Sequence, residues 1–217
     1  MAVPGKSSAR TFRDRREAGR VLAAMLAGGG IGSDVVVLGL ARGGVPVGAE
    51  VAAVLHAAVD VFVVRKLGVP RWPELAMGAI AGGEIVVNED VLSRFGTSGA
   101  ELDAVVAAET DELRRRELAY RGNVPPIALA ARTVVLVDDG IATGASMIAA
   151  IRAVRTADPR RVIVAAPVGP RGVRQRLLEE ADDVVIATLP RRFDAVGQVF
   201  ADFRQVTDEE VREALRR

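Results

Sequence analysis

Short, continuous runs of apolar residues recur along the chain and are separated by segments with a helical pattern. The runs are rich in Val, Ile and Leu and lie at 34–40, 60–65, 133–138, 161–166 and 183–188. Such runs are typical of strands that are buried on both faces, as in a parallel sheet. The helical segments between them lie at 45–58, 145–157 and 170–180. This alternation predicts an α/β fold with an open, mainly parallel sheet and helices on both faces.

Further elements are predicted outside this alternation. Helical patterns indicate a helix before the first strand, a charged helix and a short terminal helix, at 14–27, 101–120 and 206–217. Gly82-Gly83 favours a hairpin between strands at 76–81 and 84–88. Residues 67–77 hold two prolines and a glycine, which predicts a loop. We expect a single domain over residues 1–217.

Composition and charge exclude several classes of protein. Half of the residues are hydrophobic, so the chain can bury a sizeable core, and a formal net charge of +1 gives no reason to expect nucleic-acid binding. Cysteine is absent, which excludes disulfides, thiolate chemistry and cysteine metal sites. We find no signal-peptide pattern and no apolar run of about 18 residues. A cytoplasmic protein without membrane contacts is therefore expected.

The most informative segment runs from Val134 to Met147 and reads VVLVDDGIATGASM. A predicted strand ends in two adjacent carboxylates, Asp138 and Asp139, and a loop of small and hydroxyl residues then leads into an alanine-rich helix. The loop consists of Gly140, Ile141, Ala142, Thr143, Gly144, Ala145 and Ser146. Free backbone N–H groups at the start of a helix favour an anion, so the loop predicts a phosphate site.

The acid pair restricts which phosphate compound can bind beside the loop. Two carboxylates would repel a polyphosphate placed on them, whereas neutral sugar hydroxyls are suitable partners. A ribose 5-phosphate meets both requirements, with its phosphate in the loop and its 2- and 3-hydroxyls on Asp138 and Asp139. The chain has no Gly-Lys-Ser/Thr after a glycine run and no G-x-G-x-x-G after a strand, which argues against ATPase-type and dinucleotide sites.

This segment resembles the signature with which type I phosphoribosyltransferases bind 5-phosphoribosyl 1-diphosphate (PRPP). The hydrophobic run, the acid pair and the T-G-x-S loop match at the family's spacing. An ordinary strand–turn–helix would account for one acid as a helix cap, but not for two acids followed by T-G-A-S. The resemblance implies the type I fold, with a small hood at about 189–217 that covers the acceptor.

A second loop, Ala41-Arg42-Gly43-Gly44, follows the run at 34–40. Small residues, an arginine and two glycines after a strand are typical of an anion site, although a plain helix start with a tight glycine turn has the same pattern. The resemblance implies that this is the diphosphate loop, in which the family often has a cis peptide bond that does not involve proline. Here that bond would join Ala41 and Arg42.

Basic and aromatic residues elsewhere add further candidates. Lys66 is one of two lysines in the chain and follows a predicted strand beside Arg65. The pair resembles the basic pair that contacts diphosphate in orotate-type phosphoribosyltransferases, and a solvated strand end is the alternative. The loop at 67–77 corresponds in position to the family's mobile loop that closes over PRPP. Phe193 is our candidate for stacking on a flat acceptor, with a role in sealing the core as the alternative.

The resemblance implies transfer of the 5-phosphoribosyl group of PRPP to a nitrogen acceptor, a nucleobase or related heterocycle, with release of diphosphate. Asp138, Asp139, Arg65 and Lys66 would be the catalytic residues, and Mg²⁺ would arrive with the diphosphate because the protein alone holds no metal. The expected partners are PRPP, a small-molecule acceptor and a second copy in a homodimer.

Ala142 departs from the pattern of purine-salvage members, which commonly carry an acid at this position, and the acceptor therefore stays unassigned. Two other functions use the same features. One is a non-catalytic PRPP-binding regulator on the same fold, and the other is a different ribose-phosphate enzyme, such as a diphosphokinase or a hydrolase.

Overall fold

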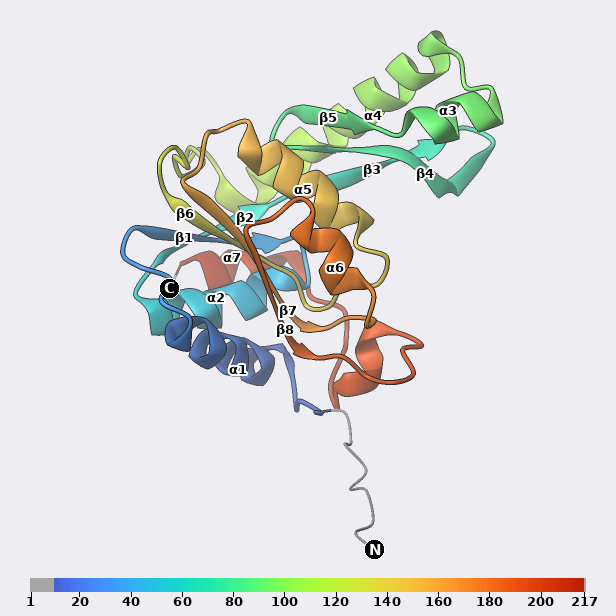
Figure 1. Ribbon diagram of the computed structural model, residues 1–217. Helices are drawn as coiled ribbons and strands as arrows, with labels where there is room; N and C mark the ends of the chain where they lie inside the picture. Colours follow the sequence, from blue (N-terminus) through green and yellow to red (C-terminus); the bar gives the residue numbers. More distant parts are fainter. Residues whose placement is uncertain (1–9, 217) are drawn as a thin grey trace, which may run out of the picture.

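The computed structural model describes residues 10–216 and contains the predicted parallel sheet (Figure 1). Five parallel strands lie in the order β2-β1-β6-β7-β8. Their bounds are Val35–Leu40 (β1), Ala58–Phe62 (β2), Thr133–Val137 (β6), Arg161–Val168 (β7) and Asp183–Thr188 (β8). After β1 the chain adds β2 on one side, and it then returns to add β6 on the other side. Ligands of open α/β sheets bind beyond the carboxyl ends of the strands at such a reversal.

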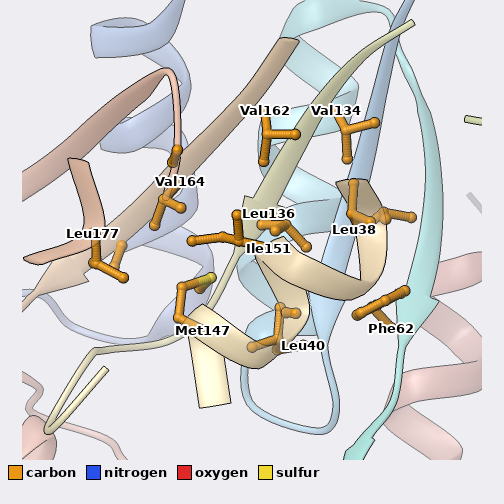
Figure 2. Packing of buried hydrophobic residues seen from close by; sticks show 14 of the residues in the cluster. Leu38, Leu40, Phe62, Val134, Leu136, Met147, Ile151, Val162, Val164 and Leu177 are labelled. Atoms are coloured by element: carbon orange, nitrogen blue, oxygen red, sulfur yellow. The ribbon is translucent and has the colours of Figure 1, made fainter. Parts of the chain in front are cut away.

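Helices cover both faces of this sheet, as the pattern predicted. Helices α1 (Arg15–Gly28) and α2 (Gly44–Leu55) lie on one face, and α5 (Ala145–Arg155) and α6 (Val173–Leu178) lie on the other. Every residue of β1 and β6 is buried, because both strands are covered from two sides. In Figure 2, Met147 and Ile151 of α5 pack beside Leu136 of β6, in a cluster that also includes Leu177 of α6.

A second, antiparallel sheet projects from the parallel one together with two helices (Figure 1). It has the order β3-β4-β5, and its elements are β3 (Val64–Val69), β4 (Trp72–Ala81), β5 (Glu84–Val87), α3 (Glu89–Phe95) and α4 (Gly99–Arg121). The expected hairpin at Gly82-Gly83 is present, and both glycines have positive φ angles. The helix α3 was not expected from the sequence.

The expectation of a loop over residues 67–77 is wrong. Almost all of this stretch lies in β3 and β4, which leaves only Pro70 and Arg71 as the turn between them. The two prolines are tolerated because Pro70 lies in the turn and Pro73 lies near the start of β4, where the pairing with β3 is irregular. The run expected as one strand at 60–65 is also divided, since β2 ends at Phe62 and β3 begins at Val64 in the other sheet.

The chain after β8 forms the hood segment and ends in helix α7 (Asp208–Leu215). The hood contains one 3₁₀ turn, Val196–Val199. Backbone hydrogen bonds join the hood to the segment before α1. The Phe12 N–H donates to the Val199 carbonyl (2.7 Å), and the Phe12 carbonyl accepts from the Ala201 N–H (2.8 Å). Between residues 10 and 216, no helix has both the length and the hydrophobicity that a membrane span requires.

Candidate functional site

Two loops meet at the carboxyl edge of the parallel sheet because β1 and β6 are neighbours. The two loops approach each other so closely that only glycine, which has no Cβ atom, fits at two positions. A Cβ atom on Gly44 would lie 2.3 Å from the Val137 carbonyl oxygen, and one on Gly43 would lie 1.9 Å from Asp139 Oδ2. The peptide bond between Ala41 and Arg42 is cis, which confirms the expectation from the family resemblance.

The segment from Gly140 to Ser146 forms a tight turn at the start of α5. Gly144 has a φ of 83°, a conformation that favours glycine, and its carbonyl begins the helix by accepting from Ile148. Ile141 is buried and donates to the Val168 carbonyl, whereas Ala142, Thr143 and Ala145 are exposed. The Ala145 N–H, the first of α5, donates to Thr143 Oγ1 (3.4 Å) within the turn. The start of α5 thus lies at an exposed turn, where the N–H groups of a helix favour an anion.

The acid pair lies partly buried at the end of β6. Asp138 Oδ1 accepts from the backbone N–H of Asp139 (2.8 Å), and Asp139 Oδ2 accepts from Arg15 Nε (2.7 Å). Burial and the neighbouring negative charge of Asp139 raise the pKa of Asp138 well above its usual value. Burial also raises the pKa of Asp139, and Arg15 opposes that shift. Carboxylate oxygens in this setting are suited to accept hydrogen bonds from hydroxyl groups.

The expected basic pair is split between two faces of β3, because successive residues of a strand point to opposite sides. Arg65 forms an ion pair with Glu109 of α4 (2.6 Å). Lys66 is exposed and lines a pocket of about 440 Å³ together with Ala145 and Ser146 at the start of α5. The structure thus brings Lys66, but not Arg65, to the same pocket as the predicted phosphate loop.

The remaining cation of the predicted site, Arg42, is half-buried after the cis peptide bond. Its Nη1 lies 3.4 Å from Asp208 Oδ1 at the start of α7, and the Tyr120 hydroxyl donates to the same oxygen. Another arginine, Arg176 of α6, donates to the Thr143 carbonyl (3.1 Å) and so contacts the predicted phosphate loop.

The hood phenylalanines are packed against protein groups. Phe193 is half-buried and packs on a cluster formed by Phe12, Ala18, Val168 and Val199. Phe203 stacks on Phe200 with ring centroids 4.9 Å apart, and the guanidinium of Arg15 lies 4.1 Å from the Phe203 centroid.

Sequence reasoning missed Arg15, which reaches the acid pair from α1. It also missed Arg176 and Asp208. No local signal could have identified Arg15, because it is one of several arginines near a helix start and its partner lies 124 positions away.

Comparisons with known proteins point to one protein family. The family model described as a phosphoribosyl transferase domain matches residues 16–202. A curated Mycobacterium tuberculosis protein, provisionally named a phosphoribosyl transferase, is 48% identical over 201 residues, or 92% of this chain. The crystal structure of TT1426 from Thermus thermophilus is 47% identical, with a TM-score of 0.83, and the match covers 94% of this chain and 97% of that one. The chain spans 45% of the length of the curated relative.

Proposed function

The chain belongs to the phosphoribosyl transferase domain family, and we propose that it transfers the 5-phosphoribosyl group of PRPP to a nitrogen acceptor with release of diphosphate. The observation that carries this proposal is the position of the acid pair. Asp138 and Asp139 lie directly beside a glycine turn that presents the N–H groups of a helix start. Hydroxyl acceptors and an anion cradle at this spacing suit a sugar phosphate.

Each part of PRPP has a partner in this arrangement. The turn from Gly140 to Ser146, including Ala142, Thr143, Gly144 and Ala145, would hold the 5-phosphate, and the two acids would accept from the ribose hydroxyls. Ala41, Arg42 and Gly43 would lie along the diphosphate, and Lys66 would contribute positive charge from β3. Arg65 would act through its ion pair with Glu109, which anchors β3 on α4.

The proposed reaction demands positioning and electrostatic stabilisation more than covalent chemistry. The acceptor nitrogen forms a bond to C1 while the bond from C1 to the diphosphate oxygen breaks, and the acceptor then loses its proton to solvent. Arg42 and Lys66 would stabilise the negative charge that develops on the departing diphosphate. The acids would keep the ribose in line with the incoming nitrogen.

Mg²⁺ fits this site as an ion carried by the substrate. Over residues 10–216, no group of three His, Cys, Asp or Glu side chains is placed to hold a metal, and Arg42 after the cis peptide bond is a cation paired with Asp208. Mg²⁺ keeps several waters and commonly binds through substrate phosphates, so ligand oxygens can supply its remaining contacts. When bound, it would neutralise diphosphate charge. A flat nitrogen heterocycle as acceptor, a homodimer and a cytoplasmic location are parts of the same proposal.

Calorimetric titration with PRPP and Mg²⁺, repeated with ATP, tests the proposal directly. We expect micromolar affinity for PRPP and none for ATP, because no ATP motif is present. Asp138→Asn combined with Asp139→Asn should weaken PRPP binding at least tenfold. The matched control is the adjacent pair Asp182→Asn with Asp183→Asn, which lies at the opposite end of the sheet. Unchanged affinity in the first double variant would refute the assignment of the acids.

Binding measurements with three separate ligands test whether Lys66 contacts the diphosphate. We expect Lys66→Ala to weaken binding of PRPP and inorganic diphosphate more than binding of ribose 5-phosphate, with Arg65→Ala as the variant on the opposite face of β3. An equal loss for all three ligands would place Lys66 at the 5-phosphate instead. Release of diphosphate during incubation with nitrogen heterocycles would then distinguish a transferase from a regulator that only binds PRPP.

A further inference from the structure

Arg15 lies in an unusual position for an arginine at the start of a helix. It is the first residue of α1, yet only 11% of its side chain is exposed. Its Nε donates to Asp139 Oδ2 (2.7 Å), and its Nη1 donates to the Arg204 carbonyl (2.8 Å). Its guanidinium also lies over the ring of Phe203.

Burial of a guanidinium is costly unless several groups compensate for the lost water. Here a carboxylate, a backbone carbonyl and an aromatic face do so together, and each contacts a different part of the planar group. A lysine has neither the plane nor the fork of donors that would make all three contacts. The site is therefore built for arginine and joins α1, the end of β6 and the hood.

The contact fixes one oxygen of Asp139. Oδ2 accepts from Arg15, and it also occupies the space that a Cβ atom on Gly43 would need. With Oδ2 held between these neighbours, the carboxylate has a defined orientation, and the Arg15 hydrogen bond leaves Oδ1 for other donors. Asp138 differs, since its Oδ1 accepts from the Asp139 backbone.

We propose that Arg15 is the positioning residue of the ribose subsite: it holds Asp139 through Oδ2 so that Oδ1 accepts a ribose hydroxyl, and it links this acid to the hood through Phe203 and Arg204. The inference rests on the proposed function, because it assumes that Asp139 binds ribose. It adds a third side chain to the subsite and explains how the hood, which would contact the acceptor, is joined to the groups that would hold PRPP.

Electrostatics support the same role. Burial raises the pKa of Asp139, and the Arg15 charge is the largest influence that lowers it. Two adjacent carboxylates repel each other when both are ionised, and a buried cation on one of them reduces that repulsion. Arg15 thus favours the charged form of Asp139, which is the form that accepts two hydrogen bonds at once.

Calorimetry on the full chain tests the inference with PRPP, ribose 5-phosphate and inorganic diphosphate as separate ligands. We expect Arg15→Met to weaken PRPP and ribose 5-phosphate at least fivefold and to change diphosphate affinity less than twofold. Arg15→Lys should recover part of the loss, because it restores the charge without the stacking. The control is Arg20→Met on the same helix, which removes an ion pair with Glu50 away from the acid pair.

The link to the hood has its own readout. Phe203→Leu should weaken ribose 5-phosphate binding in the wild-type background and have less than a twofold effect in the R15M background, because the stacking partner is then missing. Equal effects of Phe203→Leu in both backgrounds would overturn the link.

The remaining outcomes separate this inference from the proposed function. Wild-type affinity for ribose 5-phosphate in Arg15→Met, with PRPP binding intact, overturns the inference alone. If Arg15→Met weakens diphosphate binding as much as ribose 5-phosphate binding, Arg15 has a purely structural role, and this result also overturns the inference. If Arg15→Met does not fold, Arg15→Lys is compared with wild type instead. Weaker binding of PRPP and ribose 5-phosphate with unchanged diphosphate affinity then supports the inference, and wild-type affinity for ribose 5-phosphate overturns it. If the wild-type protein binds neither PRPP nor ribose 5-phosphate, both proposals fall.

Discussion

Replacing Gly43 by alanine tests the close contact between the loops that follow β1 and β6. The added methyl carbon would lie 1.9 Å from Asp139 Oδ2 and 2.4 Å from Asp139 Cγ. Favourable separations of nonbonded heavy atoms are about 3.5–4.0 Å, so one group must move by more than an ångström. Asp139 cannot move that far without losing its 2.7 Å hydrogen bond to Arg15. Overpacking of this kind costs about 1–3 kcal/mol.

The expected result is a lower melting temperature together with weaker PRPP binding. In a domain of this size each kcal/mol lowers the melting temperature by about 2–4 °C, which gives a decrease of about 2–12 °C for Gly43→Ala. Circular dichroism melts and calorimetry measure the two effects. The control is Gly28→Ala at the end of α1, where no atom lies within 4 Å of the added carbon and alanine is the better helix former. If both variants melt alike and bind PRPP alike, the reasoning about the loop contact is refuted.

Two further predictions concern buried charges. Because the pKa of Asp138 is raised in the folded protein, folding takes up a proton between the usual pKa of 3.8 and the higher folded value, and stability decreases as pH rises through that window. Asp138→Asn should therefore raise the melting temperature at about pH 8 and lose that advantage at about pH 3, whereas a constant difference would contradict this. Arg121→Met leaves the buried Asp60 without its 2.8 Å ion pair and should cost about 3–5 kcal/mol by urea denaturation. Arg115→Met on the same helix, whose pair with Glu112 is exposed, should leave the free energy of unfolding nearly unchanged.

The parallel sheet and the turns after β1 and β6 could be predicted because their signals are local. The run 134–137 is apolar throughout since the strand is covered on both faces, and the small residues that follow it reflect the turn at the start of α5. The first strand of the second sheet gave no comparable signal. β3 pairs with β4 in an irregular register, and the apolar residues from Val61 to Val64 continue without a break while the chain passes from one sheet to the other.

The division of the basic pair was predictable in principle. Once Arg65 and Lys66 lie on one strand, alternation requires that their side chains point to opposite faces. The sequence pattern placed Arg65 at the end of a predicted strand and only Lys66 after it, so the alternation was not applied to the pair. The ion pair of Arg65 with Glu109 shows that one face of β3 lies against α4. The opposite face, with Lys66, lines the pocket beside Ser146.

The residues of the proposed site come from two parts of the fold, the parallel sheet and the elements around it. The groups proposed to bind phosphate and ribose follow β1 and β6, whose backbone hydrogen bonds fix them relative to each other. Arg42 follows β1 as well, whereas the other cations come from outside the parallel sheet: Lys66 from the second sheet, Arg15 from α1 and Arg176 from α6. A shift of the β3-β4-β5 sheet would therefore change the position of Lys66 and leave the acids in place. A shift of α1 or the hood would act on Asp139 through Arg15. If the proposed subsites are right, an acceptor bound at the hood would affect the ribose subsite without any movement of the parallel sheet.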